Sequence, residues 1–228
     1  MRGLPPAIAG FFLAMLPLLS GAALVPVLEG EALFDDDLKI IFLADMNLAA
    51  SETLGVENID PNGTMNWFTA GNFVAAMNAF DGGNGWLGIN NWRLPETVIP
   101  DAGCETTASN PPPSFGFNCT LSEMGHLYYE ELGLAANDSL TTGLTTARAA
   151  AENAGFTNLI GGPYWSGTEN VGSSSYDFFF NGGSQATLSR AFPGGVLPVA
   201  DFLIPLPATA WLFISGLLSL VGLRRRRT

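Results

Sequence analysis

Two glutamates and the only histidine of the chain recur at helical spacing and could bind a metal ion. Glu123, His126 and Glu130 lie at positions i, i+3 and i+7, so a regular helix places them on one face. A carboxylate-bridged centre for two metal ions needs two Glu-x-x-His helices, and one histidine supplies only one of them. We therefore predict no metal site, with Glu123 capping the helix and His126 on the surface or half-buried.

Two acidic turns resemble parts of calcium loops. The segment Asn58 to Gly63 matches the start of an EF-hand loop, but Thr69 stands where the twelfth position needs a bidentate carboxylate. A turn built on Pro61-Asn62-Gly63 is therefore the favoured interpretation. The run Asp35-Asp36-Asp37 is a looser calcium candidate and is typical of a solvated turn before a strand. The sequence predicts no cofactor, with calcium left open.

Three aromatic residues are the candidates for ligand binding, because an aromatic ring can stack on the apolar C–H face of a sugar. Trp86 lies in a glycine-rich loop, where we expect an exposed platform. Tyr164 and Trp165 lie in a predicted strand, and tryptophan at such positions more often packs in the core.

The motifs of common hydrolases are missing from the chain. There is no Gly-x-Ser-x-Gly elbow, no second histidine and no glycine-rich phosphate loop. The 21 acidic residues single out no pair for glycoside hydrolysis. We predict no catalytic residue and no enzymatic activity. A surface enzyme acting on exopolysaccharide or protein is the alternative.

Cys104 and Cys119 are the two cysteines, and they flank a proline-rich segment. An even pair of cysteines in an exported chain predicts a disulfide. By the loop-entropy model, a bridge of this length stabilises the fold by about 3 kcal/mol.

The charge distribution excludes one class of partner. Between the terminal segments, 4 basic residues oppose all 21 acidic ones, so the formal net charge there is −17. Such a surface repels phosphate backbones and anionic glycans, so we predict no nucleic-acid partner. Neutral glycans, divalent cations and basic proteins remain as partners.

The N-terminus has the pattern of an export signal. Arg2 precedes an apolar run from Ile8 to Leu19, and small residues from Ser20 to Ala23 follow. We predict that residues 1–23 form a signal peptide that is removed.

The C-terminus combines a proline motif, an apolar run and four arginines. The run from Ala208 to Leu223 has no charged residue and, as a helix of 16 residues, would be about 24 Å long. That length is marginal for a bilayer core of roughly 30 Å. We predict a transmembrane helix whose arginine-rich end stays in the cytoplasm.

These C-terminal features resemble the PEP-CTERM class of bacterial surface-sorting signals. The motif from Ile204 to Ala208 is similar to the V-P-L-P-A variant, with Ile204 where valine is usual. The resemblance implies cleavage by a membrane-embedded cysteine protease, an exosortase. A plain tail anchor is the alternative. The residues assigned to sorting and processing are Pro205, Leu206, Pro207, Ala208, Arg224, Arg225, Arg226 and Arg227.

Between the two terminal segments, hydrophobic periodicity predicts helices and strands around one core. A capping box and an apolar stripe make the helix Glu123 to Gly133 the clearest of them. The other predicted helices begin at Asn66 and span 145–154, and the predicted strands span 38–43, 86–95, 156–159, 164–168, 176–180 and 187–192. Pro193-Gly194-Gly195 is predicted to open a linker to the sorting segment.

Several short blocks in order resemble the bacterial surface domain named after the C-terminal domain of the Legionella collagen-like adhesin. The blocks are Trp92-Arg93-Leu94-Pro95, the helix from Glu123, Phe156 to Leu159, Tyr164 to Thr168, and Phe178 to Gly182. The resemblance implies an α+β, C-type-lectin-like fold, in which two main helices flank a small twisted antiparallel sheet. It also implies surface adhesion or glycan contact. The stretch from Leu188 to Pro193 departs from the family pattern at the last strand.

These observations together predict three segments: a signal peptide at 1–23, a surface domain at 24–200 and a sorting signal at 201–228. The predicted function is non-catalytic adhesion or binding of a neutral glycan in the exopolysaccharide or biofilm of a Gram-negative bacterium. The predicted route passes through the inner membrane, by way of the C-terminal helix, to the cell surface or extracellular matrix. An exosortase-type protease is the expected processing partner.

Overall fold

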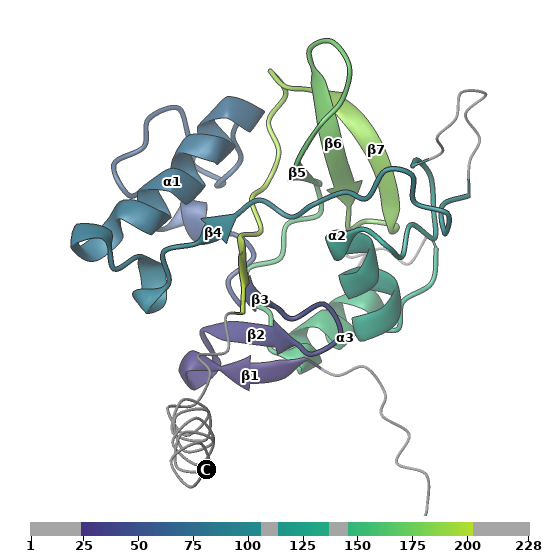
Figure 1. Ribbon diagram of the computed structural model, residues 1–228, viewed down its shortest axis with the longest axis horizontal. Helices are drawn as coiled ribbons and strands as arrows, with labels where there is room; N and C mark the ends of the chain where they lie inside the picture. Colours follow the sequence, from purple (N-terminus) through teal and green to yellow (C-terminus); the bar gives the residue numbers. More distant parts are fainter. Residues whose placement is uncertain (1–23, 106–113, 137–145, 203–228) are drawn as a thin grey trace, which may run out of the picture.

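The computed structural model describes residues 24–105, 114–136 and 146–202 (Figure 1). Eight strands in these residues form two antiparallel sheets, with orders β1-β2-β3-β8-β4 and β5-β6-β7. The strands are β1 (Val25–Val27), β2 (Ala32–Asp35), β3 (Ile40–Leu43), β4 (Trp92–Arg93), β5 (Pro163–Glu169), β6 (Ser174–Phe179), β7 (Ser184–Ser189) and β8 (Val199–Asp201).

The helices of the described residues are short apart from the first. They are α1 (Trp67–Gly83), α2 (Glu123–His126) and α3 (Thr146–Ala154). Single turns of other helix types complete the set: the 3₁₀ turns η1 (Leu28–Gly30), η2 (Leu48–Ala50) and η3 (Trp86–Gly88), and the π turn η4 (Leu127–Glu131).

Strand β3 lies at the centre of the fold because its residues are apolar on both faces and all four are buried. Ile40 and Phe42 belong to a core shared with η4 and with aromatic side chains of the three-stranded sheet. Ile41 and Leu43 belong to a second core, shared with α1. Figure 1 shows α1 on one side of β3 and β8, and α2 and α3 on the other. The five-stranded sheet therefore separates two cores.

Strand β8 comes from the end of the described chain and lies inside the five-stranded sheet. It pairs with β3 through Phe42 and Val199, and with β4 through Trp92 and Ala200. The segment predicted to be a linker after Pro193 is thus buried sheet structure. Strand β8 ends at Asp201, the first residue assigned to the sorting segment.

Helix α1 begins where the sequence predicted. The side chain of Asn66 accepts a hydrogen bond from the backbone N–H of Thr69 at 3.0 Å, which caps the helix. The predicted apolar stripe of Ala70, Phe73, Val74 and Met77 is buried.

The predicted helix from Glu123 to Gly133 is present in a different form. Four residues of α-helix are followed by the π turn η4, where the N–H of Leu132 donates to the carbonyl of Leu127 at 3.0 Å. The residue before the helix is Ser122, so the predicted capping box at Thr120 does not form. The change from α to π geometry alters which side chains share a face.

The predicted fold class is wrong. A C-type-lectin-like unit with two main helices and one small sheet is replaced by a mixed fold of two antiparallel sheets and three α-helices in the described residues. The cause is three strands that the sequence analysis did not identify, namely β1, β2 and β8.

The membrane helix in that prediction is corrected as well. Across 24–105, 114–136 and 146–202, no helix combines the length and the apolar character needed to cross a membrane. The segment predicted to span it, 208–223, lies outside the described residues.

Candidate functional site

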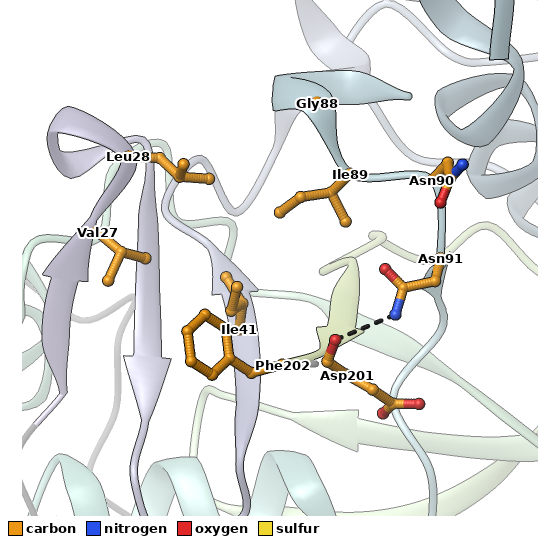
Figure 2. A pocket seen from close by; sticks show the side chains of 9 residues that line it. All are labelled: Val27, Leu28, Ile41, Gly88, Ile89, Asn90, Asn91, Asp201 and Phe202. Carbon is orange, nitrogen blue, oxygen red and sulfur yellow. Dashed lines mark hydrogen bonds between the residues drawn. The ribbon is translucent and has the colours of Figure 1, made fainter. Parts of the chain in front are cut away.

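A pocket of about 300 Å³ opens between the five-stranded sheet and the loop that follows η3 (Figure 2). We call it the Phe202 pocket. It is lined by Val27, Leu28, Ile41, Gly88, Ile89, Asn90, Asn91, Asp201 and Phe202.

The apolar wall of the Phe202 pocket is built on the sheet. The backbone N–H of Phe202 donates to the carbonyl of Lys39 at 3.0 Å, which continues the pairing of β8 with β3 by one residue. The ring of Phe202 packs on that of Phe34, with centroids 4.5 Å apart. Ile41 and Ile89 complete this wall, as Figure 2 shows. Sheet pairing and ring packing therefore both hold the ring of Phe202 in place.

The polar wall carries the side chains of Asn90 and Asn91, and the carboxylate of Asp201 lies at its edge, turned away from the Phe202 ring. The side-chain amide of Asn91 donates to the backbone carbonyl of Asp201 at 3.1 Å, and that of Asn90 donates to the carbonyl of Gly83 at 3.2 Å. The carboxylate of Asp201 is 58% exposed and forms an ion pair with Arg93 at 2.8 Å. These bonds hold the polar groups beside the apolar wall.

Arg93 of the Trp-Arg-Leu-Pro block supports Asp201 from outside the Phe202 pocket. Its guanidinium also forms two hydrogen bonds with the carboxylate of Glu123, at 2.7 and 2.8 Å. Burial alone would lower the pKa of Arg93, but the hydrogen bonds and charges of Glu123 and Asp201 raise it. Glu123, which was considered as a metal ligand, is therefore a partner of this arginine.

The composition of the Phe202 pocket suits binding better than catalysis. An apolar surface with a few placed polar groups is the usual form of a small-molecule site. Among the described residues, Asp201 is the only ionisable one that lines it, so the described lining contains no pair of a nucleophile and a base.

Two of the three predicted ligand-binding aromatics lie in the core. Tyr164 and Trp165 have no exposed surface. The hydroxyl of Tyr164 accepts a hydrogen bond from the N–H of Ile160 at 3.1 Å, and burial raises the pKa of this phenol. The indole N–H of Trp165 donates to the carbonyl of Met65 at 2.8 Å. Because their rings are enclosed, neither residue offers a face to a ligand in this structure.

Trp86 is half-buried and lies in the turn that leads to the Phe202 pocket. Its ring meets that of Phe80 edge to face at 5.0 Å, and its carbonyl accepts the indole N–H of Trp92 at 2.9 Å. The residues after it, Gly88 to Asn91, line the pocket, whereas the ring of Trp86 does not. Trp86 positions the loop.

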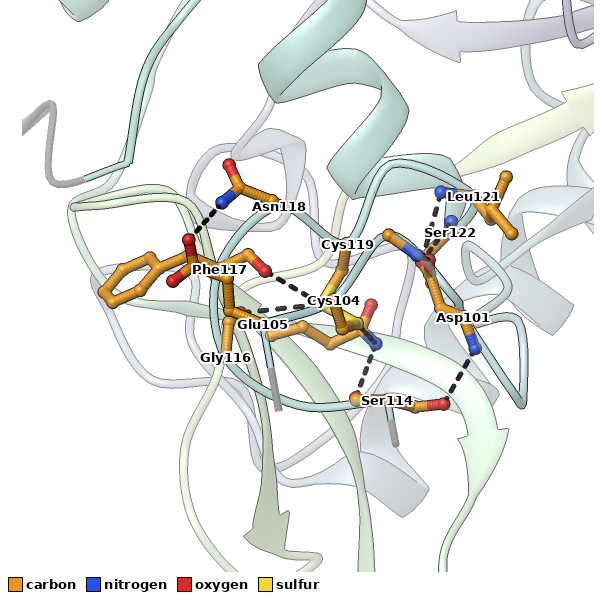
Figure 3. Close-up of a disulfide and its surroundings, with 12 residues drawn as sticks. Asp101, Cys104, Glu105, Ser114, Gly116, Phe117, Asn118, Cys119, Leu121 and Ser122 are labelled. Atoms are coloured by element: carbon orange, nitrogen blue, oxygen red, sulfur yellow. Dashed lines mark hydrogen bonds between the residues drawn. A yellow bond between two sulfur atoms is a disulfide. The ribbon is translucent and has the colours of Figure 1, made fainter. Parts of the chain in front are cut away.

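The predicted disulfide between Cys104 and Cys119 is confirmed, with an S–S distance of 2.06 Å (Figure 3). Asp101 is fully buried beside it. One carboxylate oxygen of Asp101 accepts from the N–H of Gly103, and the other from the N–H groups of Leu121 and Ser122. The hydroxyl of Ser122 also donates to Asp101, at 3.2 Å.

The geometry around this disulfide is structural. The carboxylate of Asp101 and the two sulfurs lie close enough to share a metal ion. The sulfurs are bonded to each other, however, and a metal needs them as thiolates. We therefore assign this cluster to loop stability.

The predicted sorting residues, 205–208 and 224–227, lie outside the described residues. The sequence analysis also missed the residues that form the Phe202 pocket. Asp201 and Phe202 were assigned to the sorting segment, although the apolar run from Val196 to Ala200 just before them could have indicated a strand. Asn90 and Asn91 were treated as part of a strand that in fact begins at Trp92.

Comparison with protein-family models, with curated proteins and with solved structures found no match to this chain.

Proposed function

We propose that the protein is a non-catalytic surface or matrix protein that binds a neutral sugar residue of an exopolysaccharide in the Phe202 pocket. The observation that carries the proposal is the placement of the Phe202 ring and the side chains of Asn90 and Asn91 in the lining of one pocket. A pyranose presents apolar C–H groups on its face and hydroxyls on its rim. These match an aromatic wall and a polar wall respectively.

Charge favours a neutral glycan over an anionic one. The two carboxylates of Asp201 and Glu123 outnumber the single guanidinium of Arg93 beside the pocket, so this group of charges repels a carboxylate or a sulfate. The wider chain adds to this preference, because 4 basic residues oppose 21 acidic ones between its terminal segments.

The proposed location is the cell surface or extracellular matrix. The signal-like N-terminus and the Cys104–Cys119 disulfide support export, because disulfides persist in oxidising compartments. Processing by an exosortase-type protease is part of this proposal and rests on the Pro205 to Ala208 motif. Recovery of surface protein that still carries Arg224 to Arg227 would overturn the processing step.

The binding proposal is tested with an array of neutral and anionic glycans probed with the full chain. We expect signal on neutral glycans only. Phe202→Ala should weaken that binding about tenfold, because it removes the stacking face. Phe192→Ala is the matched control, since Phe192 is a 50% exposed phenylalanine that does not line the Phe202 pocket. Absence of any neutral ligand, or equal binding by the two variants, would overturn the proposal.

A further inference from the structure

Three side chains outside the Phe202 pocket converge beneath the π turn. Asp35 comes from the end of β2, His126 from the end of α2 and Glu131 from the end of η4. The Nε2 atom of His126 lies 3.5 Å from Oδ2 of Asp35 and 3.4 Å from Oε1 of Glu131. We call these three residues the Asp35 cluster.

The polar atoms of the Asp35 cluster are buried and unpartnered. The side chains of Asp35 and Glu131 have no exposed surface, and that of His126 is 12% exposed. Apart from their long contacts with one another, Oδ2 of Asp35, Nε2 of His126 and both carboxylate oxygens of Glu131 have no hydrogen-bond partner among the described residues. Buried polar groups in this state are costly and need an explanation, such as an ion that they share.

The charge of the cluster has the sign that attracts a cation. Within the described chain, neither carboxylate forms an ion pair with lysine or arginine. Burial raises the pKa of both Asp35 and Glu131, so the protonated forms are favoured without a cation, and a bound cation would stabilise the ionised forms. Two carboxylates and one imidazole form a ligand set for a divalent metal ion.

The distances distinguish shared coordination from direct hydrogen bonding. The two separations, 3.4 and 3.5 Å, exceed those of well-formed hydrogen bonds, which are about 2.7–3.2 Å. Ligands bound tetrahedrally at about 2.1 Å from a zinc ion are about 3.4 Å from one another. The two separations from His126 are close to that value, and all three atoms lie within 4.8 Å of one another, which is compatible with ligands around one ion.

We propose that Asp35 Oδ2, His126 Nε2 and Glu131 Oε1 bind a divalent transition-metal ion. This site is separate from the Phe202 pocket and does not depend on glycan binding. Three protein ligands leave one tetrahedral position, which the partial exposure of His126 opens to water.

The π turn explains why Glu131 takes part and Glu130 does not. In a regular α-helix, the residue at i+4 from His126 shares its face, and that residue is Glu130. In a π turn the repeat lengthens to i+5, so Glu131 takes this place and Glu130 is exposed. Insertions of this kind in helices occur frequently at functional sites.

The turn after β2 orients the other carboxylate. Oδ1 of Asp35 accepts hydrogen bonds from the backbone N–H groups of Asp37 and Leu38, at 2.9 and 2.8 Å. These bonds fix one oxygen of the carboxylate and leave Oδ2 for the ion. Support of this kind behind a ligand is typical of metal sites.

The test is a calorimetric titration of the full chain, stripped with a chelator, with ZnCl₂, MnCl₂ and CaCl₂ in separate runs. We expect one Zn²⁺ or Mn²⁺ per chain. At a free concentration 100 times the dissociation constant, the bound ion should raise Tm by about 5–10 °C.

Two variants locate the site and two serve as matched controls. Asp35→Asn and Glu131→Gln should each weaken binding at least about tenfold. Asp36→Asn and Glu130→Gln alter exposed neighbours and should bind as the unchanged chain does. Circular dichroism checks the fold of each variant, and having two ligand variants guards against one that does not fold. No Zn²⁺ or Mn²⁺ binding, binding of Ca²⁺ alone, or undiminished binding by both ligand variants would overturn the proposal.

Discussion

Asp101 and Asp35 are both fully buried carboxylates, yet their surroundings differ in one respect. Both oxygens of Asp101 accept hydrogen bonds from neighbouring N–H groups and a hydroxyl. Asp35 uses one oxygen in this way, and its other oxygen faces Glu131 and His126 without a donor. Burial is thus common to a structural carboxylate and to a proposed ligand. The unmet hydrogen-bonding capacity is what separates them.

The difference has a source in backbone geometry. Around Asp101, irregular loop segments on both sides of the disulfide leave N–H groups free to point at the carboxylate. Around Glu131, most of the backbone belongs to helical turns and a strand, whose N–H groups are already paired. Regular structure therefore leaves a buried carboxylate without donors.

The largest expected effect is on the Asp101 side of the comparison. Asp101→Ala removes the acceptor of the Gly103, Leu121 and Ser122 donors and should lower the free energy of unfolding by about 4 kcal/mol. Urea denaturation measures the change. Asp36→Ala, at an exposed aspartate, should stay within about 0.5 kcal/mol of the unchanged chain. If Asp101→Ala lowers the free energy of unfolding by no more than about 0.5 kcal/mol, the hydrogen bonds to Asp101 do not stabilise the fold and its contrast with Asp35 is lost.

A third carboxylate, Asp177, extends the comparison. It is 1% exposed, and neither of its oxygens has a hydrogen-bond partner among the described residues. Burial raises its pKa from 3.8 to about 7. The folded state binds the proton of Asp177 more tightly than the unfolded state does. The free energy of unfolding therefore falls as the pH rises from about 4 to about 7, and it changes no further above pH 7. Asp177→Asn removes the charge but keeps an unpartnered amide, so at pH 8 it should stabilise by about 2 kcal/mol.

Denaturation of both chains at pH 4 and pH 8 tests this expectation. The pH dependence should be weaker in Asp177→Asn, and added Zn²⁺ should leave the effect of this substitution unchanged because Asp177 belongs to neither cluster. Equal pH dependence in the two chains would contradict the raised pKa.

The smallest expected effect is at Glu131 without metal. Its pKa is raised, first by burial and then by the charge of Asp35, so its ionisation lowers stability as the pH rises above its ordinary value of 4.5. Glu131→Gln should therefore raise the free energy of unfolding at pH 8 by about 1 kcal/mol in a chelator. Glu130→Gln, at an exposed site, should have no effect. Destabilisation by Glu131→Gln in the chelator would show that the cluster is satisfied without an ion.

Parts of the fold could be predicted because their signals are local. Asn66 caps α1 through its own side chain, and the apolar run before Ala44 identifies β3. The predicted turn at Gly172 does separate two strands, although β6 already begins at Ser174, inside the predicted turn. The disulfide followed from the number of cysteines and the expected compartment.

The rest depends on partners distant in the sequence. Strands β1, β2 and β8 have at most four residues each, and pairing rather than length defines them. The Phe202 pocket joins Asn90 and Asn91 to Asp201 only because β8 lies between β3 and β4. The Asp35 cluster depends on a π turn. A search at 3.6-residue periodicity assumes a regular α-helix and therefore selects Glu130 in place of Glu131.

The internal position of β8 has a consequence for how the chain is made. Strand β8, at residues 199–201, lies between β3 and β4 and pairs with both. The five-stranded sheet therefore cannot form completely before these residues have been synthesised. Closure waits until nearly all of the domain has been synthesised.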